Sequence, residues 1–216
     1  RFVKMTKTMA RHALSWEQSM EDAFRVGDTE ERTNIYIRMR KLSSGYVSTD
    51  DGPHYFKEQP KLDAFLQLLS EFDRQMICFL NFKDTADLVI RELRNKGISH
   101  AEITGRVSNK GAQMEKFRGG ARVLIGSKAA MVGLNLQFCN YGCFYESPDS
   151  MAMRLQAQKR IDRMGQTLPT FLFDLVTAGT YDGRILAALQ DRKSVFDQVV
   201  SGRRLEGESN AIFAQE

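Results

Sequence analysis

Cysteine, proline and long apolar runs are all scarce in this sequence. Its 216 residues include three Cys and four Pro. An odd number of Cys, with Cys78 inside the apolar run MICFLNF, is not the pattern of a disulfide-stabilised secreted domain. No stretch approaches the roughly 18 apolar residues of a transmembrane helix, and the N-terminal RFVKMTKTMARHALSW lacks the apolar core of a secretory signal. We therefore expect buried free thiols, no membrane partner and an intracellular, cytoplasmic location.

Histidine is equally scarce, which bears on metal binding. Cys139 and Cys143 have C-x3-C spacing, but the three His residues, at positions 12, 54 and 100, are not beside them. A structural zinc ion takes a complete set of Cys and His ligands. That set cannot be assembled convincingly here, so we predict no metal site.

The overall composition is that of an ordinary soluble globular protein, with 42% hydrophobic and 27% charged residues. The net charge of +4 is compatible with a nucleic-acid partner without demonstrating one. Because the chain starts at Arg1 with no initiator Met, we expect it to be a fragment of a longer protein.

Helix and strand patterns alternate from Lys61 onward. KLDAFLQLLSEF, DTADLVIRELRNKG and GAQMEKFRGG have helical patterns, the second with Asp84 as a possible N-cap and Gly97 as its stop. Five segments predict buried strands: QMICFLNF, ISHAEITG, ARVLIGS, NYGCFYE and TFLFDLVT. TYDGRILAALQDRKSVFDQVV predicts a closing helix or helix pair. This order favours an α/β fold, a mostly parallel sheet with helices on both faces, whose ligands bind at the carboxyl ends of the strands.

Residues 1–56 have a different pattern. WEQSMEDAFRV and EERTNIYIRMRKL are polar and helical, and the Gly/Ser/Asp-rich SSGYVSTDDGPHYF predicts a loop. We interpret this region as a helical connector and not as a second domain.

A further helix is predicted between Ser147 and Gly165. Ser147 can act as its N-cap, Pro148 suits the first turn, and Gly165 can take the left-handed conformation that ends a helix. On such a helix Gln156, Arg160 and Arg163 would lie within an arc of roughly 60°, beside the buried face. This stripe is either a solvated, salt-bridged face or a set of guanidinium donors for a phosphate.

Several motifs around this helix resemble one protein family. GSKAAMVGLNLQ, YESPDSMAMRLQAQKRIDRMGQ and LVTAGTYDGRILAAL follow one another in this order, after MICFLNFKDTADLVIRELRNKGI and AEITGRVSNKGAQMEKFRGG. Together they resemble the C-terminal, second RecA-like helicase lobe of superfamily 2 ATPases of the Swi/Snf type. The resemblance implies a RecA-like lobe over residues 57–200, after a connector (1–56) from a missing first lobe, with residues 201–216 as a tail.

The resemblance also implies residue roles. Arg163 would be the principal arginine finger and Arg160 its partner, both directed at ATP held with Mg²⁺ mainly by the first lobe. The remaining residues divide into a nucleotide-facing set (Gly133, Asn135, Gln156 and Gln166) and a set that contacts the backbone of double-stranded DNA (Asn81, Lys83, Thr104, Gly105, Ser127 and Lys128).

The sequence departs from the family pattern at three places. Ala130 and Met131 replace two glycines, Asp162 replaces a histidine, and Asp182–Gly183 stands where acidic residues are usual. In addition, no G-x4-G-K-[ST] loop and no D-E-x-[HD] box occurs, so we expect this lobe alone to be inactive.

Two functions are therefore open. The first is the second motor lobe of an ATP-dependent DNA helicase or double-stranded DNA translocase. The second is a degenerate, non-catalytic module for DNA binding or protein docking. The short connector is more similar to compact bacterial or phage members than to nuclear remodellers.

Overall fold

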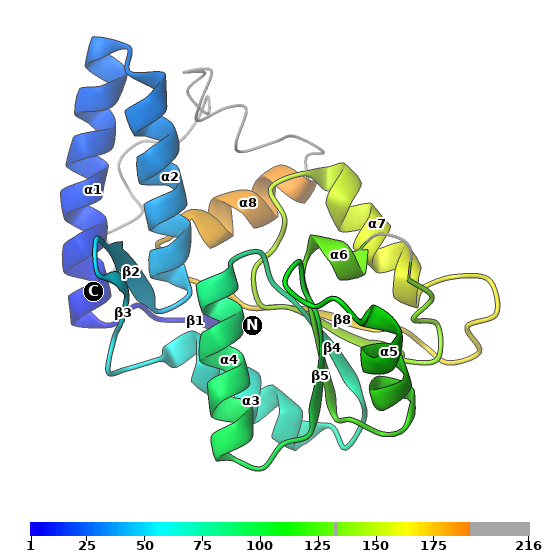
Figure 1. Cartoon of the computed structure of the whole chain (residues 1–216). Helices are drawn as coiled ribbons and strands as arrows, with labels where there is room; N and C mark the ends of the chain where they lie inside the picture. The colour runs from blue at the N-terminus through cyan, green and yellow to red at the C-terminus, as the bar shows by residue number, and fades with distance from the viewer. Residues whose placement is uncertain (132–133, 191–216) are drawn as a thin grey trace. The chain divides into compact units, whose positions relative to one another are not determined.

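A computed structural model describes residues 1–131 and 134–190 (Figure 1). The chain divides into two compact units. One consists of Leu62–Leu175 together with Arg1, and the other of Phe2–Lys61 with the segment that starts at Val176. Among the described residues, no helix is long and apolar enough to cross a membrane.

The first unit is built on a five-stranded, fully parallel sheet in the order β5-β6-β4-β7-β8. The strands are β4 (Met76–Phe79), β5 (His100–Ile103), β6 (Val123–Gly126), β7 (Tyr141–Phe144) and β8 (Phe171–Asp174). The central strands β4 and β6 are buried along their whole length, which is why their sequences are continuous apolar runs without alternation. The predicted α/β, RecA-like fold is confirmed.

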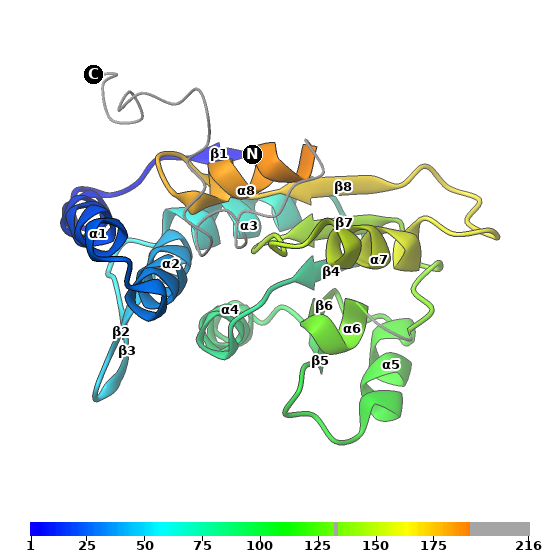
Figure 2. The ribbon, with the colours of Figure 1, turned by 90° about the horizontal axis from the view of Figure 1, so that it is seen from above.

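Helices cover both faces of this sheet. The helices are α3 (Pro60–Glu71), α4 (Lys83–Asn95), α5 (Lys110–Arg118), α6 (Lys128–Met131) and α7 (Met151–Ile161). Figure 2 shows α5, α6 and α7 on one face and α4 on the other, as right-handed crossovers between parallel strands require. On the α5 and α7 face, the core is close-packed at Gly142, where an added Cβ would lie 2.7 Å from Ile161 Cδ1 and from Leu172 Cδ2.

The second unit contains two long helices, α1 (Lys7–Val26) and α2 (Thr29–Ser43), each started by a side-chain cap, Thr6 Oγ1 or Asp28 Oδ1. The segment predicted as a loop forms instead a β-hairpin, β2 (Tyr46–Thr49) and β3 (Gly52–Tyr55). Tyr46 and Tyr55 pair across it with ring centroids 5.5 Å apart, a cross-strand contact that the polar composition concealed.

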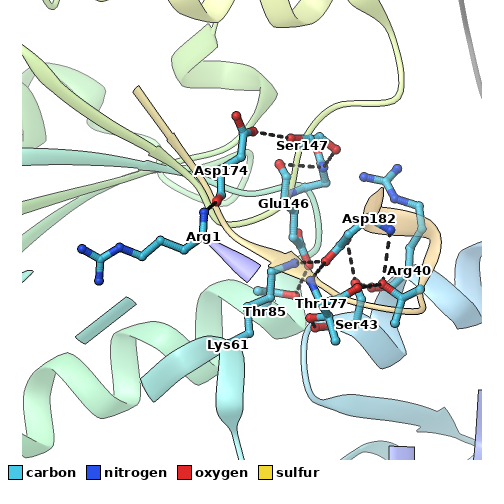
Figure 3. A network of polar contacts seen from close by, with 12 residues as sticks. Arg1, Arg40, Ser43, Lys61, Thr85, Glu146, Ser147, Asp174, Thr177 and Asp182 are labelled. Atoms are coloured by element: carbon cyan, nitrogen blue, oxygen red, sulfur yellow. Dashed lines mark hydrogen bonds and ion pairs between the residues drawn. The ribbon is translucent and has the colours of Figure 1, made fainter. Parts of the chain in front are cut away.

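The predicted strand over residues 170–177 is also corrected, because it is two strands in two sheets. β8 ends at Asp174, and β9 (Val176–Thr177) pairs in parallel with β1 (Phe2–Val3) in the second unit. There, α8 (Tyr181–Gln190) carries the buried carboxylate of Asp182. Asp182 Oδ2 accepts from Lys61 Nζ at 2.6 Å and from the Thr177 N–H at 3.0 Å, and Oδ1 accepts from Ser43 Oγ at 2.9 Å (Figure 3).

Candidate nucleic-acid edge and arginine helix

The carboxyl ends of β4, β5 and β6 meet around a hollow of about 270 Å³. Its lining comes from the three loops that follow these strands and from the first turn of α4: Leu80, Asn81, Phe82, Lys83, Ala86, Thr104, Gly105, Arg106 and Ser127. Five of the six residues predicted to contact nucleic acid are in this set. The sixth, Lys128, is exposed at the first position of α6, directly after Ser127.

The loop after β6 is held close to the sheet. The Ser127 N–H donates to Ile103 O at 3.1 Å, and Ser127 O accepts from the Ala130 N–H at 2.8 Å. A Cβ at Gly126 would lie 2.7 Å from Ala130 Cβ. A larger residue at 126 would therefore have to displace Ala130, whose buried methyl group packs on Gly126.

Two carboxylates position a cation in the same hollow. Arg106 Nε donates to Glu102 Oε1 at 2.6 Å, and Arg106 Nη1 pairs with Asp87 Oδ1. Hydrogen bonding to Glu102, with a further contribution from Asp87, raises the pKa of Arg106 above its ordinary value. The Thr104 hydroxyl donates to Glu102 Oε1 at 2.5 Å. The sequence prediction missed Arg106, although it directly follows Thr104 and Gly105, which were both predicted to contact DNA.

The loop after β4 is shaped from a distance by Glu146, which is 2% exposed. Glu146 Oε2 accepts from the N–H groups of Asn81 (2.6 Å) and Phe82 (3.0 Å), while Oε1 accepts from Thr85 Oγ1 at 2.6 Å (Figure 3). α4 therefore begins at Lys83 with Phe82 as its N-cap, which corrects the prediction of Asp84. Hydrogen bonds from a residue more than sixty positions away are invisible to local sequence patterns.

Asn81 is engaged within the protein. Its Nδ2 donates to the backbone oxygens of Glu146 at 3.3 Å and Ser147 at 3.1 Å. Its amide donors are thus directed at the connection between β7 and α7, which leaves the side-chain oxygen, an acceptor, as the group that could meet a ligand.

The helix that carries Arg160, here called the arginine helix, is α7, and its start differs from the prediction. α7 begins at Met151 with Ser150 as its N-cap, three residues after the predicted cap at Ser147. Ser147 Oγ instead donates to Asp174 Oδ1 at 2.9 Å and accepts from Arg154 Nη1 at 3.0 Å. Because this polar contact reaches across to β8, it competes with the local capping bond.

Arg154 ties α7 to the sheet. It is 7% exposed, and its guanidinium makes two hydrogen bonds with the Asp174 carboxylate, the one from Nη2 to Oδ2 at 2.8 Å. It also lies over the Phe144 ring, 3.5 Å from the centroid. No local sequence pattern indicated that Arg154 would be buried while Arg163 is exposed.

The predicted end of the helix is also corrected. α7 ends at Ile161, so Arg163 lies in the following turn and the stripe of three residues on one helix face does not form. Asp162 is the C-cap, where a negative charge interacts unfavourably with the helix dipole. Gln166 folds back, donating from Nε2 to Gln137 O at 2.8 Å and accepting on Oε1 from the Leu168 N–H at 3.0 Å. Gly165 does take the predicted left-handed conformation, with φ 98°.

The remaining residues that the sequence predicted to act on the nucleotide, including both proposed arginine fingers, are placed as follows. Arg160 is half-buried on α7, and its carbonyl accepts from the Leu136 N–H at 3.1 Å. Gln156 and Arg163 are exposed. Asn135 is exposed and accepts from the Gln137 N–H at 3.3 Å. Gly133 lies outside the described residues.

Neither the thiols nor the carboxylates gather into a metal site within the described part of the chain, where no group of three or more His, Cys, Asp and Glu could hold an ion. Cys78, Cys139 and Cys143 are free and buried. Burial raises the pKa of the Cys139 thiol to about 11.

Comparison with known proteins supports the resemblance to helicases. Residues 60–165 match the helicase conserved C-terminal domain. Over these residues the chain is similar to the C-terminal lobe of superfamily 2 helicases of the Swi/Snf type. It is 30% identical over 137 residues to the uncharacterized ATP-dependent helicase YqhH of Bacillus subtilis, covering 62% of this chain and 25% of that protein. It is 26% identical over 146 residues to Helicase domino of Drosophila melanogaster, covering 65% of this chain and 5% of that protein. The chain thus spans a quarter or less of these relatives.

Two solved structures share the fold of this helicase lobe. The C-terminal part of the Fun30 ATPase domain superimposes with a TM-score of 0.59 at 19% identity, over 66% of this chain and 52% of that one. S. cerevisiae Dbp5 bound to RNA and ADP BeF3 gives a TM-score of 0.55 at 20% identity, over 62% and 36%.

Proposed function

We propose that this chain is the second motor lobe of an ATP-dependent DNA helicase or double-stranded DNA translocase. Its role is to hold the DNA backbone at the hollow beyond β4, β5 and β6 and to supply arginine to ATP bound mainly by a first lobe. The observation that carries the proposal is the gathering of Lys83, Thr104, Arg106 and Ser127 around one hollow, from the first turn of α4 and two loops that are separate in sequence.

The donor set suits phosphate recognition without base readout. Lys83 supplies a point charge on a flexible stem, Arg106 a guanidinium held in place by two carboxylates, and Ser127 a hydroxyl. Contacts of this kind fix the register of a duplex and carry no sequence information. Asn81, whose amide donors are used within the protein, orients the loop that leads into Lys83.

The nucleotide role rests on Arg160 and Arg163. An arginine finger stabilises the charge that develops on the transferred phosphoryl group and contributes about 10³ to 10⁵ in rate. Arg163 is exposed in a turn, and no carboxylate among the described residues forms an ion pair with it, so it is available to a phosphate. Gln166 and Asn135 support the turn and the loop opposite it. Mg²⁺ would be held with ATP by the companion lobe and would neutralise the β- and γ-phosphates.

DNA binding by the chain itself tests the first half of the proposal. Fluorescence anisotropy with a short labelled duplex, at about 50 mM salt and above, should give an affinity that falls linearly in log–log form with salt. Lys83→Ala should weaken binding to every sequence alike and reduce the salt slope by about 1.

Lys96→Ala is the matched control, since it removes the same charge at the far end of α4, where Lys96 pairs with Glu92 at 3.4 Å. Equal effects of the two substitutions would show that the hollow is not the DNA site. Two results together would favour the non-catalytic module. The chain alone would bind DNA tightly, and Arg163→Ala would leave ATP hydrolysis by the two-lobe enzyme unchanged.

A further inference from the structure

The loop that leads into Lys83 and the helix that carries Arg160 are attached to the same two consecutive residues. Glu146 and Ser147 lie in the connection from β7 to α7. One side of this dipeptide holds the loop after β4, and the other side holds α7 and β8. We propose that Glu146 and Ser147 form a positioning junction through which DNA at the hollow alters the arginine helix.

The Glu146 side of the junction is well defined by hydrogen bonds. Its carboxylate accepts from two successive backbone N–H groups, at Asn81 and Phe82, and from the buried Thr85 hydroxyl. The backbone N–H of Glu146 in turn donates to Phe79 O at 3.2 Å. The residues immediately before Lys83 are therefore fixed to this connection from both directions.

The Ser147 side joins the helix. Its hydroxyl lies between the Asp174 carboxylate (2.9 Å) and the Arg154 guanidinium (3.0 Å), and Figure 3 shows Ser147 directed at Asp174. Its carbonyl accepts from the Asn81 amide. Ser147 therefore contacts both the loop after β4 and the Arg154–Asp174 pair. Arg154 and Arg160 both belong to α7, so a shift of Arg154 is carried to Arg160 along one continuous helix.

The burial of these groups makes the junction stiff. Glu146 and Arg154 are 2% and 7% exposed, and hydrogen bonds between charged, buried groups are strong and directional. Glu146 and Ser147 are joined by one peptide unit, which fixes their Cα atoms about 3.8 Å apart. A displacement of the Glu146 backbone therefore moves Ser147 as well. DNA that draws Lys83 toward a phosphate pulls on Asn81 and Phe82, and thereby on Arg154.

This inference rests on the proposed DNA site, and its test separates the two. Two-dimensional NMR of the chain labelled with 15N-arginine reports the Nε–H signals of Arg106, in the hollow, and of Arg154, buried behind the junction. The probe is a duplex of about one helical turn, roughly 10 base pairs. In the wild type, both signals should shift on titration, with the same apparent Kd.

Glu146→Ala and Ser147→Ala should each abolish the Arg154 shift at saturating DNA while the Arg106 shift remains. Glu146→Gln should keep both shifts, because its amide oxygen can accept from the two N–H groups and its NH₂ can donate to Thr85. Ser147→Ala removes one hydroxyl and keeps the inference testable if Glu146→Ala fails to fold.

An Arg154 shift of wild-type size in both alanine variants would overturn the junction, as would an Arg106 shift with no Arg154 shift in the wild type. In both cases the DNA site itself would stand. If neither signal shifts and anisotropy detects no binding, the proposed function fails and the junction fails with it.

Discussion

Replacing Arg154 by methionine tests how firmly the arginine helix is fixed to the sheet. The substitution keeps an unbranched, apolar stem over Phe144 and removes the guanidinium. Asp174, whose side chain is 19% exposed, then loses both hydrogen bonds from Arg154 and keeps the one from Ser147 Oγ.

The expected cost follows from the burial of the pair. Breaking a fully buried ion pair by removing one partner costs about 3–5 kcal/mol. The partial exposure of Asp174 lowers this figure, whereas loss of the cation–π contact with Phe144 adds about 1 kcal/mol. We therefore expect Arg154→Met to reduce the free energy of unfolding by about 3 kcal/mol.

The assay is urea unfolding followed by far-UV circular dichroism. The single tryptophan, Trp16, belongs to the other compact unit, so its fluorescence does not report α7 directly. A double-mutant cycle with Asp174→Asn isolates the pairwise energy, expected at about 2 kcal/mol. A loss below about 1 kcal/mol together with a coupling energy near zero would refute this reasoning and leave apolar packing as the force that holds α7.

Three other outcomes are expected. Burial raises the pKa of Cys139 to about 11, so its thiol should be almost wholly protonated at about pH 8. Cys139 should therefore resist iodoacetamide until the chain is unfolded. Rapid labelling of Cys139 in the native protein, located by mass spectrometry, would contradict this. Burial, with smaller contributions from Lys116 and Arg94, lowers the pKa of His100 below its ordinary 6.5, so the unfolded chain binds the extra proton and stability should fall as pH drops through 6.5. His100→Gln should flatten that pH dependence in urea titrations, and an unchanged slope would exclude His100 as its source. Gly126→Ala should cost about 1–3 kcal/mol of stability because its Cβ would overlap Ala130; a thermal melt like that of the wild type would show that α6 moves aside freely.

Much of the sheet was predictable because its signal is local. The runs around Ile77 and Leu124 are apolar at every position, which is what a strand covered on both faces requires. Gly97 and Gly165 both take the predicted left-handed conformation, since such a turn favours glycine whatever surrounds it. The gathering of the loops after β4, β5 and β6 at one edge then followed from the parallel direction of these strands.

The ends of α7 were not predictable, because distant partners decide them. Ser147 has the composition of a cap, yet its hydroxyl is taken by Asp174 and Arg154. Near the other end, Gln166 reaches Gln137, which no periodicity reveals. Gln156 and Arg160 consequently lie on α7, whereas Arg163, the proposed principal finger, lies in the turn that follows.

Arg163 is proposed to act on ATP in a two-lobe enzyme. The most direct measurement is DNA-stimulated ATP hydrolysis by the two-lobe protein carrying Arg163→Ala, with Lys159→Ala, an exposed cation on α7, as its control. We expect a loss of about 10³-fold or more in kcat for Arg163→Ala, with duplex affinity unchanged and with Lys159→Ala similar to the wild type. Turnover retained by Arg163→Ala would contradict the assignment.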